Sequence, residues 1–165
     1  MIRPERPGDE GAIHAVEKAA FGKELEPQIV DDVRASDAFV PELSLVHEDA
    51  GEIVGHVMVS RGHVEPSGDE ILLLGPIGVT PERQGEGIGR ALVEAALTGS
   101  RARGAACVAL VGDPAFYERF GFVQAEPLGV LPPEGWPSRA FQVAILDPEA
   151  DLPQGRVVYS EPFRH

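Results

Sequence analysis

A glycine-rich segment in the middle of the chain has the residue types that bind an anion. It reads Gln84-Gly85-Glu86-Gly87-Ile88-Gly89-Arg90 and lies between an apolar run and a long stretch with helical periodicity. The first N–H groups of a helix lack intrahelical partners, and with the helix dipole they attract negative charge. Glycine also lets an anion approach the backbone closely. The pattern therefore predicts an anion-binding loop at the start of a helix.

The spacing of the glycines distinguishes this loop from two common nucleotide-binding motifs. Gly85, Gly87 and Gly89 lack the G-x-G-x-x-G spacing of dinucleotide folds, and the chain has no G-x-x-x-x-G-K-[ST] sequence. The segment instead matches the pattern Q/R-x-x-G-x-G/A, which is the pyrophosphate loop of the GCN5-related N-acetyltransferases, the GNAT superfamily. The chain resembles that superfamily in this loop.

A second motif extends the resemblance. The segment from Gly112 to Phe122 reads GDPAFYERFGF and contains the family's Tyr-x-x-x-Gly-Phe element, starting at Tyr117, about 30 residues after the loop. This segment, together with 74–79 and 157–163, is similar to a bacterial subgroup of acetyltransferases called YhbS-like. The resemblance covers most of the chain, and it implies an acetyl-CoA-dependent N-acetyltransferase that uses acetyl-CoA as co-substrate.

The resemblance also implies roles for individual residues. The backbone of Ile77, Gly78 and Val79 would lie along the pantetheine and bind the acetyl carbonyl, and Tyr117 would lie near the CoA sulfur as general acid. The backbone N–H groups of the loop would hold the pyrophosphate, which assigns cofactor binding to Gln84, Gly85, Glu86, Gly87, Ile88, Gly89 and Arg90. Arg83 and Arg90 either contact CoA phosphates or stay solvated.

The expected reaction is direct attack of an amine on the thioester in a ternary complex. A phenol, of pKa about 10, can protonate a departing thiolate, of pKa about 8.5. Many relatives carry an acid two or three residues before the position of Val79, where this chain has Pro76 and Ile77. The base is therefore unassigned. Four acids are candidates by location only: Glu24, Glu26, Glu42 and Glu70.

Hydrophobic periodicity predicts the elements that position these residues. Helices are expected at 9–21, 27–35 and 87–103, with a short one capped by Asp113, and strands at 2–4, 43–47, 53–61, 71–79, 105–111, 122–123, 140–146 and 156–159. Proline cannot donate a ladder hydrogen bond, so Gly75-Pro76 predicts a bulge in its strand.

This order predicts an α/β (α+β) architecture of the GNAT fold. A central, mostly antiparallel twisted sheet contains a splayed parallel pair, the strands of Val79 and Val108, and helices flank both faces. The 165 residues fit one domain, 1–165, with no linker or internal repeat.

The composition of the chain limits the kinds of binding partner to expect. The formal net charge of −13 disfavours nucleic acid, and no run approaches the length needed to span a membrane. The expected partner is a small-molecule or peptide amine; the oligomeric state stays open, with a homodimer as one option. The only cysteine, Cys107, lies in an apolar run and is expected in the core, which fits a cytoplasmic protein. The histidines, at 14, 47, 56, 63 and 165, show no metal-binding spacing.

A second hypothesis is a non-catalytic domain that binds acyl-CoA and senses it. Both hypotheses need the loop, but only the enzyme needs Tyr117 and an open cleft for an acceptor. His56 alternates with Val57 on a strand, and it either faces that cleft or is a hydrogen-bonded histidine of the sheet. Trp136 either walls the acceptor site or pins a loop.

Overall fold

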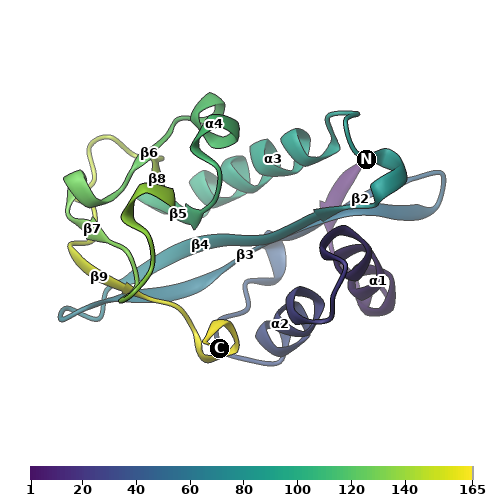
Figure 1. The fold of residues 1–165 in the computed structure, drawn as a ribbon, viewed down its shortest axis with the longest axis horizontal. Coiled ribbons are helices and arrows are strands. Elements are labelled where there is room, and N and C mark those ends of the chain that lie inside the picture. Colours follow the sequence, from purple (N-terminus) through teal and green to yellow (C-terminus); the bar gives the residue numbers. More distant parts are fainter. Residues whose placement is uncertain (165) are drawn as a thin grey trace.

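The computed structural model describes residues 1–164, in which nine strands form one sheet with helices on both faces (Figure 1). The strands are β1 (Ile2–Pro4), β2 (Ser44–Asp49), β3 (Glu52–Glu65), β4 (Glu70–Val79), β5 (Cys107–Val111), β6 (Phe122–Gln124), β7 (Val130–Leu131), β8 (Phe141–Ile145) and β9 (Gly155–Val158). The helices are α1 (Glu10–Phe21), α2 (Leu25–Arg34), α3 (Ile88–Ala102) and α4 (Pro114–Tyr117).

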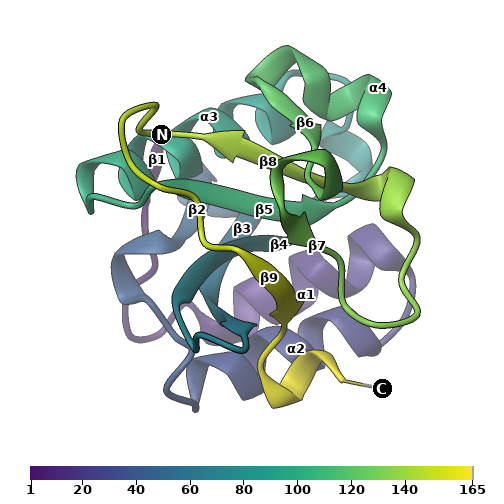
Figure 2. The same ribbon diagram turned by 90° about the vertical axis from the view of Figure 1, so that its left-hand side faces the viewer.

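The sheet has the order β1-β2-β3-β4-β5-β8-β6, and β9 pairs with both β3 and β7. Within the described residues, β4–β5 and β7–β9 are the parallel pairs and the other pairings are antiparallel. The helix α3 covers β2, β3 and β4 on one face, whereas α1 covers β3 and β4 on the other, with α2 beside it (Figure 2). The predicted fold class is confirmed.

Side chains of β4 alternate between the two layers, as the pleat of a strand requires. Leu72 and Leu74 belong to the core cluster under α3, together with Leu92 and Val93 of that helix. Ile71 and Leu73 belong to a second cluster on the opposite face. The strand β4 is therefore buried on both sides, and its two faces belong to different compartments of the protein.

The strands β4 and β5 pair for only part of their length. Leu72 pairs with Val108 and Leu73 with Ala109, after which β4 continues to Val79 without β5. Its register with β3 shifts between Val57 and Val59, opposite the Gly75-Pro76 segment. The predicted bulge and the predicted divergence of the two strands are both confirmed.

Most predicted elements agree with the structure to within a few residues. The strand β3 extends to Glu65 because its end pairs with β9, where His63 lies opposite Val158. The short strand β7 was missed; it pairs with β9 through Val130 and Gly155. Both differences arise from pairing between distant segments, which a local hydrophobic pattern does not report.

None of the helices in residues 1–164 is both long and apolar enough to cross a membrane.

The packing of α3 on the sheet gives a prediction about stability. Leu92 has no exposed surface and lies in the cluster between α3 and the sheet. Leu92→Ala should lower the free energy of unfolding by about 2–5 kcal/mol, because it leaves a cavity in the core. Urea denaturation measures the change. Leu128→Ala, at a site 37% exposed, is the control and should change stability by less than about 0.5 kcal/mol. Equal midpoints for the two variants would contradict this packing.

Candidate active site

The glycine-rich loop adopts the geometry that an anion site needs. Gly85 and Gly87 have φ angles of +84° and +86°, which side chains other than glycine rarely adopt. Gly87 is the N-cap residue of α3, and no side chain caps the helix there. The first-turn N–H groups of α3, at residues 88–90, are therefore available to a ligand.

Two hydrogen bonds fix this loop to the end of β4. The Gln84 side chain donates from Nε2 to the Val79 carbonyl oxygen at 3.1 Å, and the Thr80 N–H donates to Val54 of β3 at 2.9 Å. Backbone groups alternate in direction along an antiparallel strand. Because Thr80 points toward β3, Val79 and Ile77 point their N–H and carbonyl groups to the other side, into the splay between β4 and β5.

The loop opens onto a hollow of about 390 Å³ next to α4. Its lining consists of Val79, Arg83, Gln84, Gly85, Gly87, Ile88, Gly89, Arg90, Phe116 and Arg119. The structure thus brings most of the predicted cofactor-binding residues around one space. Four predicted site residues lie outside this lining: Ile77, Gly78, Glu86 and Tyr117.

The sequence-based prediction missed two residues of this hollow, Phe116 and Arg119. They are three residues apart, so one turn of the α4 segment presents both toward the loop. The Arg119 guanidinium lies 5.2 Å from the centre of the Phe116 ring, and no carboxylate of the described residues pairs with it. The signal available in the sequence was this i, i+3 spacing beside Tyr117.

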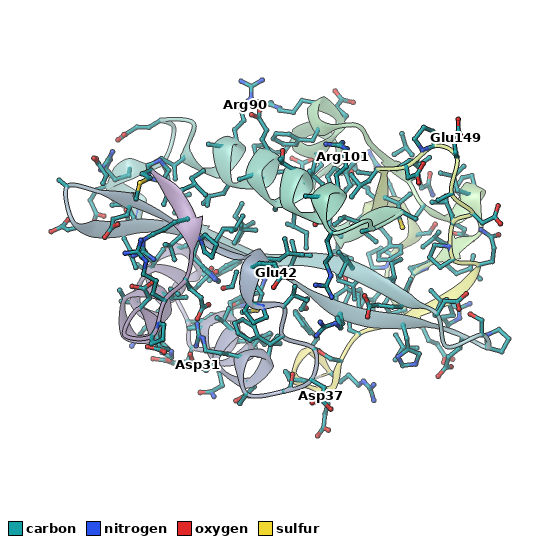
Figure 3. The ribbon with its side chains drawn as sticks, turned by 180° about the vertical axis from the view of Figure 1, so that it is seen from behind. Asp31, Asp37, Glu42, Arg90, Arg101 and Glu149 are labelled. Atoms are coloured by element: carbon teal, nitrogen blue, oxygen red, sulfur yellow. The ribbon has the colours of Figure 1, made fainter. Side chains whose placement is uncertain are left out.

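The two arginines predicted from the sequence, unlike Arg119, have acidic partners. Arg83 forms ion pairs with both Asp49 and Glu86 at 2.9 Å. Arg90 projects from the outer side of α3, away from the sheet (Figure 3), with Glu94 at 3.6 Å. Of the three cations around the hollow, Arg119 is the one whose charge no acid of the described residues offsets.

Tyr117 lies at the end of α4, where aromatic rings surround it. The ring centres of Phe116 and Phe122 are 4.9 and 5.7 Å away. The helix starts as predicted, because the Asp113 carboxylate accepts a hydrogen bond from the Ala115 N–H at 3.0 Å. Burial raises the pKa of the Tyr117 phenol, so this side chain stays protonated well above neutral pH.

Comparison with known proteins decides the family. Residues 41–124 match the model of the acetyltransferase (GNAT) domain. The chain is 33% identical to the N-acetyltransferase YhbS of Escherichia coli (strain K12), over 99% of this chain and 98% of that protein. The chain belongs to the GNAT family of acetyltransferases.

Solved structures of GNAT proteins share this fold across the whole chain. The crystal structure of YhbS from Escherichia coli in complex with CoA has a TM-score of 0.90 at 32% identity, and covers 99% of this chain and 91% of that one. A GNAT acetyltransferase from Brucella melitensis in complex with acetyl-CoA has a TM-score of 0.82 at 37% identity, and covers 99% of this chain and 97% of that one. The predicted superfamily and subgroup are confirmed.

On the other face of β4, this GNAT protein contains a polar network in which Glu17, His56 and Ser44 have no exposed surface. The Glu17 carboxylate lies 2.6 Å from His56 Nδ1, and His56 Nε2 lies 2.9 Å from the Ser44 hydroxyl. Ser44 donates to Glu5, which Arg34 binds at 2.7 Å. His56 is therefore a hydrogen-bonded histidine of the sheet, with no exposed surface.

The Ser44 hydroxyl fixes the direction of one hydrogen bond of His56. Because the Ser44 hydroxyl donates to Glu5, His56 Nε2 donates to Ser44. Its Nδ1 then either donates to the Glu17 carboxylate or accepts from the carboxylic acid. Burial raises the pKa of Glu17, and the hydrogen bond with His56 opposes that shift.

The four candidate bases differ in their surroundings. Glu24 pairs with Lys18 at 2.7 Å, Glu42 with Arg103 at 2.6 Å, and Glu70 with Arg61 at 3.4 Å. These three carboxylates form ion pairs on the surface. Glu26 has one buried oxygen, Oε1, with no hydrogen-bond partner among residues 1–164.

Nothing in the described part of the GNAT chain groups three or more His, Cys, Asp or Glu side chains in a way that could hold a metal ion. His165 lies outside the described residues. Cys107 is buried in the core, as predicted, and burial raises the pKa of its thiol to about 11. A group of that pKa is a poor nucleophile at neutral pH.

The ion pairs of His14 give a prediction about pH. His14 lies 2.7 Å from Asp31 and 2.9 Å from Glu24, so it links α1 to α2. The hydrogen bond to Asp31, followed by that to Glu24, raises the pKa of His14. The stabilisation is complete below the unfolded-state pKa of about 6.5 and is lost as pH rises through the higher folded-state pKa.

His14→Gln should therefore lower the free energy of unfolding more in mild acid than in mild alkali, with a difference of about 1 kcal/mol or less. Urea denaturation at about pH 6 and about pH 9 measures it. His63→Gln, next to the exposed Glu65, is the control. A His14→Gln deficit of the same size at both pH values would contradict the ion-pair assignment.

Proposed function

We propose that this chain is a single N-acetyltransferase domain, residues 1–165, that transfers the acetyl group of acetyl-CoA to a primary amine of a small molecule or peptide. The amine attacks the thioester directly in a ternary complex. The observation that carries the proposal is the position of the anion-binding loop, directly after the strand that diverges from β5. Membership of the GNAT family supports it.

The hollow fits the phosphate end of CoA. It combines the free first-turn N–H groups of α3 with Arg119, and both attract a pyrophosphate. The pantetheine would then follow β4 into the splay, where the backbone groups of Ile77 and the Val79 N–H face away from β3. The relatives from Escherichia coli and Brucella melitensis contain CoA and acetyl-CoA, which supports this assignment.

The residues around the thioester have to stabilise the carbonyl oxygen and protonate the departing thiolate. Negative charge builds on the carbonyl oxygen during attack, and a fixed N–H of Ile77 or Val79 would stabilise it. The departing thiolate needs a proton, which the Tyr117 phenol would supply. Its raised pKa keeps Tyr117 protonated at neutral pH, whereas a free thiol has a pKa of about 8.5.

Replacing Gly89 tests CoA binding. A Cβ at this position meets only Val79 Cγ2, at 3.8 Å, so a side chain fits on the helix but enters the hollow. Gly89→Trp should weaken CoA binding at least tenfold, about 1.4 kcal/mol, with little loss of thermal stability. Calorimetry measures the affinity, and Thr98→Trp, on an exposed position of α3, is the matched control. Unchanged affinity in Gly89→Trp would remove the CoA site from this loop.

Tyr117→Phe tests the general acid. Pools of amines, aminoglycosides, polyamines and peptides are first screened for acetyl transfer. Once an acceptor is identified, kcat should fall at least tenfold, since general acid catalysis contributes about 10²–10⁴-fold, while CoA affinity stays unchanged. The loss should shrink for thioesters with better leaving groups.

Tyr159→Phe is the control, because Tyr159 packs with Trp136 and Phe163 in a separate cluster. If Tyr117→Phe keeps the full rate under conditions where chemistry limits turnover, the proton comes from water or from the substrate. If no amine in the pools is acetylated while CoA binds, the chain is a non-catalytic acyl-CoA-binding domain.

A further inference from the structure

We propose that Glu17 and Glu26 form the site that binds the ammonium group of the acceptor, and that the Glu17 carboxylate takes its proton. This inference rests on the proposed acetyl transfer and supplies the base that the strand β4 lacks. From Ile71 to Val79, β4 carries no acidic residue. The proton acceptor must therefore come from another element, and α1 and α2 are the helices packed on that face of the sheet.

Glu17 has an oxygen that no group of the protein uses. The side chain has no exposed surface, and its Oε2 is bound to His56. Its Oε1 has no hydrogen-bond partner among the described residues. A buried carboxylate oxygen without a partner destabilises the fold, because its desolvation is not offset by a hydrogen bond. A ligand with N–H groups would satisfy it.

This oxygen lies against the strand that would hold the thioester. A Cβ built on Gly78 would be 2.5 Å from Glu17 Oε1, so the carboxylate occupies the space that a side chain would fill. Gly78 lies beyond the point where β4 leaves β5, between Ile77 and Val79. Glu17 Oε1 is therefore next to the backbone groups that face the splay, on the face of the sheet opposite α3.

Glu26 contributes a second oxygen of the same kind. It lies in the first turn of α2, and its Oε1 is also buried without a hydrogen-bond partner among residues 1–164. Burial is the main cause of the raised pKa of Glu17, and the Glu26 charge acts in the same direction. The Glu26 side chain is 17% exposed, and Lys23 lies 3.7 Å from Oε2, so Glu26 has one oxygen near solvent and one that is buried.

The groups around Glu17 come from three elements, β3, α2 and β4. His56 faces it from β3 and Glu26 from α2, while β4 presents only the uncharged Gly78. Beyond His56, Ser44 leads to the ion pair of Glu5 and Arg34. A primary ammonium group has three N–H donors, and two neighbouring carboxylates would complement its charge and accept its hydrogen bonds. Burial raises the pKa of Glu17, which makes its carboxylate a stronger base.

The proposed reaction begins with proton transfer. The Glu17 carboxylate accepts one proton from R–NH₃⁺, which leaves a neutral amine. The amine nitrogen attacks the thioester carbon; a C–N bond forms, the C–S bond breaks, and Tyr117 protonates the departing thiolate. The amide nitrogen loses a second proton, which returns Tyr117 to its phenol form. The proton on Glu17 then leaves to solvent, so each turnover releases one proton. His56 acts as a positioning residue that directs Oε1 toward Gly78.

The binding test uses n-butylammonium as the probe. The protein is labelled with carbon-13 at the glutamate carboxylates and saturated with CoA, and the Glu17 and Glu26 signals are assigned from Glu17→Gln and Glu26→Gln. Both signals should shift on addition of n-butylammonium and stay in place with n-butanol, which has the same chain without the charge. If both signals stay in place with n-butylammonium at saturation, the site is overturned.

The kinetic test uses the acceptor found by the screen. Glu17→Gln should lower kcat/KM about 100-fold with unchanged CoA affinity. The acidic limb of the pH profile that Glu17 sets should disappear. The rate should instead follow the deprotonation of the amine itself in solution. Glu42→Gln, which removes a surface carboxylate paired with Arg103, should have no effect.

Ser44→Ala separates catalysis from structure, because it weakens the same buried network on the far side of His56. It should lower the melting temperature but keep the acidic limb. If transfer occurs and Glu17→Gln retains both the rate and the acidic limb, this inference fails while the proposed function stands. If CoA binds and no amine is acetylated, the proposed function fails, and the carboxylate shifts still decide whether the ammonium site exists.

Discussion

The separation of β4 from β5 is the constraint on which the site depends. Only Leu72 and Leu73 pair with β5, and the bulge at Gly75-Pro76 redirects the rest of β4. A strand that loses its neighbour leaves backbone groups unpaired, and such groups need another partner. Here β3 pairs with the opposite edge of β4 as far as Val79, beyond the register shift, and so positions the backbone groups that face away from it. Fixed, unpaired N–H groups are what binding and stabilising a carbonyl oxygen require.

The two faces of the sheet contribute groups of opposite charge to the candidate site. The helix α3 packs on one face and brings its uncapped N-terminus to the end of β4, which concentrates positive potential there. The helices α1 and α2 pack on the other face and bring carboxylates, among them Glu17 and Glu26. In the proposed function, an anionic co-substrate and a cationic acceptor would thus be attracted to opposite sides of one strand. The splay between β4 and β5 is where the two sides meet.

Those parts of the site that depend on neighbouring residues could be predicted from the sequence. The loop 84–90 and the helix after it are local, and the Asp113 cap fixes α4 within a few residues. Glu17 could not be placed in this way, because its partner His56 is 39 residues away in the chain. One local signal was present: Glu17 falls on the same helix face as Ile13 and Val16, which are buried. A charged residue on an apolar face predicts a buried partner, but it does not identify that partner.

The buried pair of Glu17 and His56 is hard to explain by stability alone. Taking two ionisable groups out of water is costly, and apolar side chains of similar size often stabilise a fold as well or better. The position of the carboxylate also suits glycine at position 78, where an added Cβ would lie 2.5 Å from Glu17 Oε1 and would displace it. A purely structural pair would use both carboxylate oxygens in hydrogen bonds, as Glu5 does with Arg34 and Ser44. Glu17 uses one and keeps the other against the strand that faces the splay, an arrangement that suits a group which must accept a proton there.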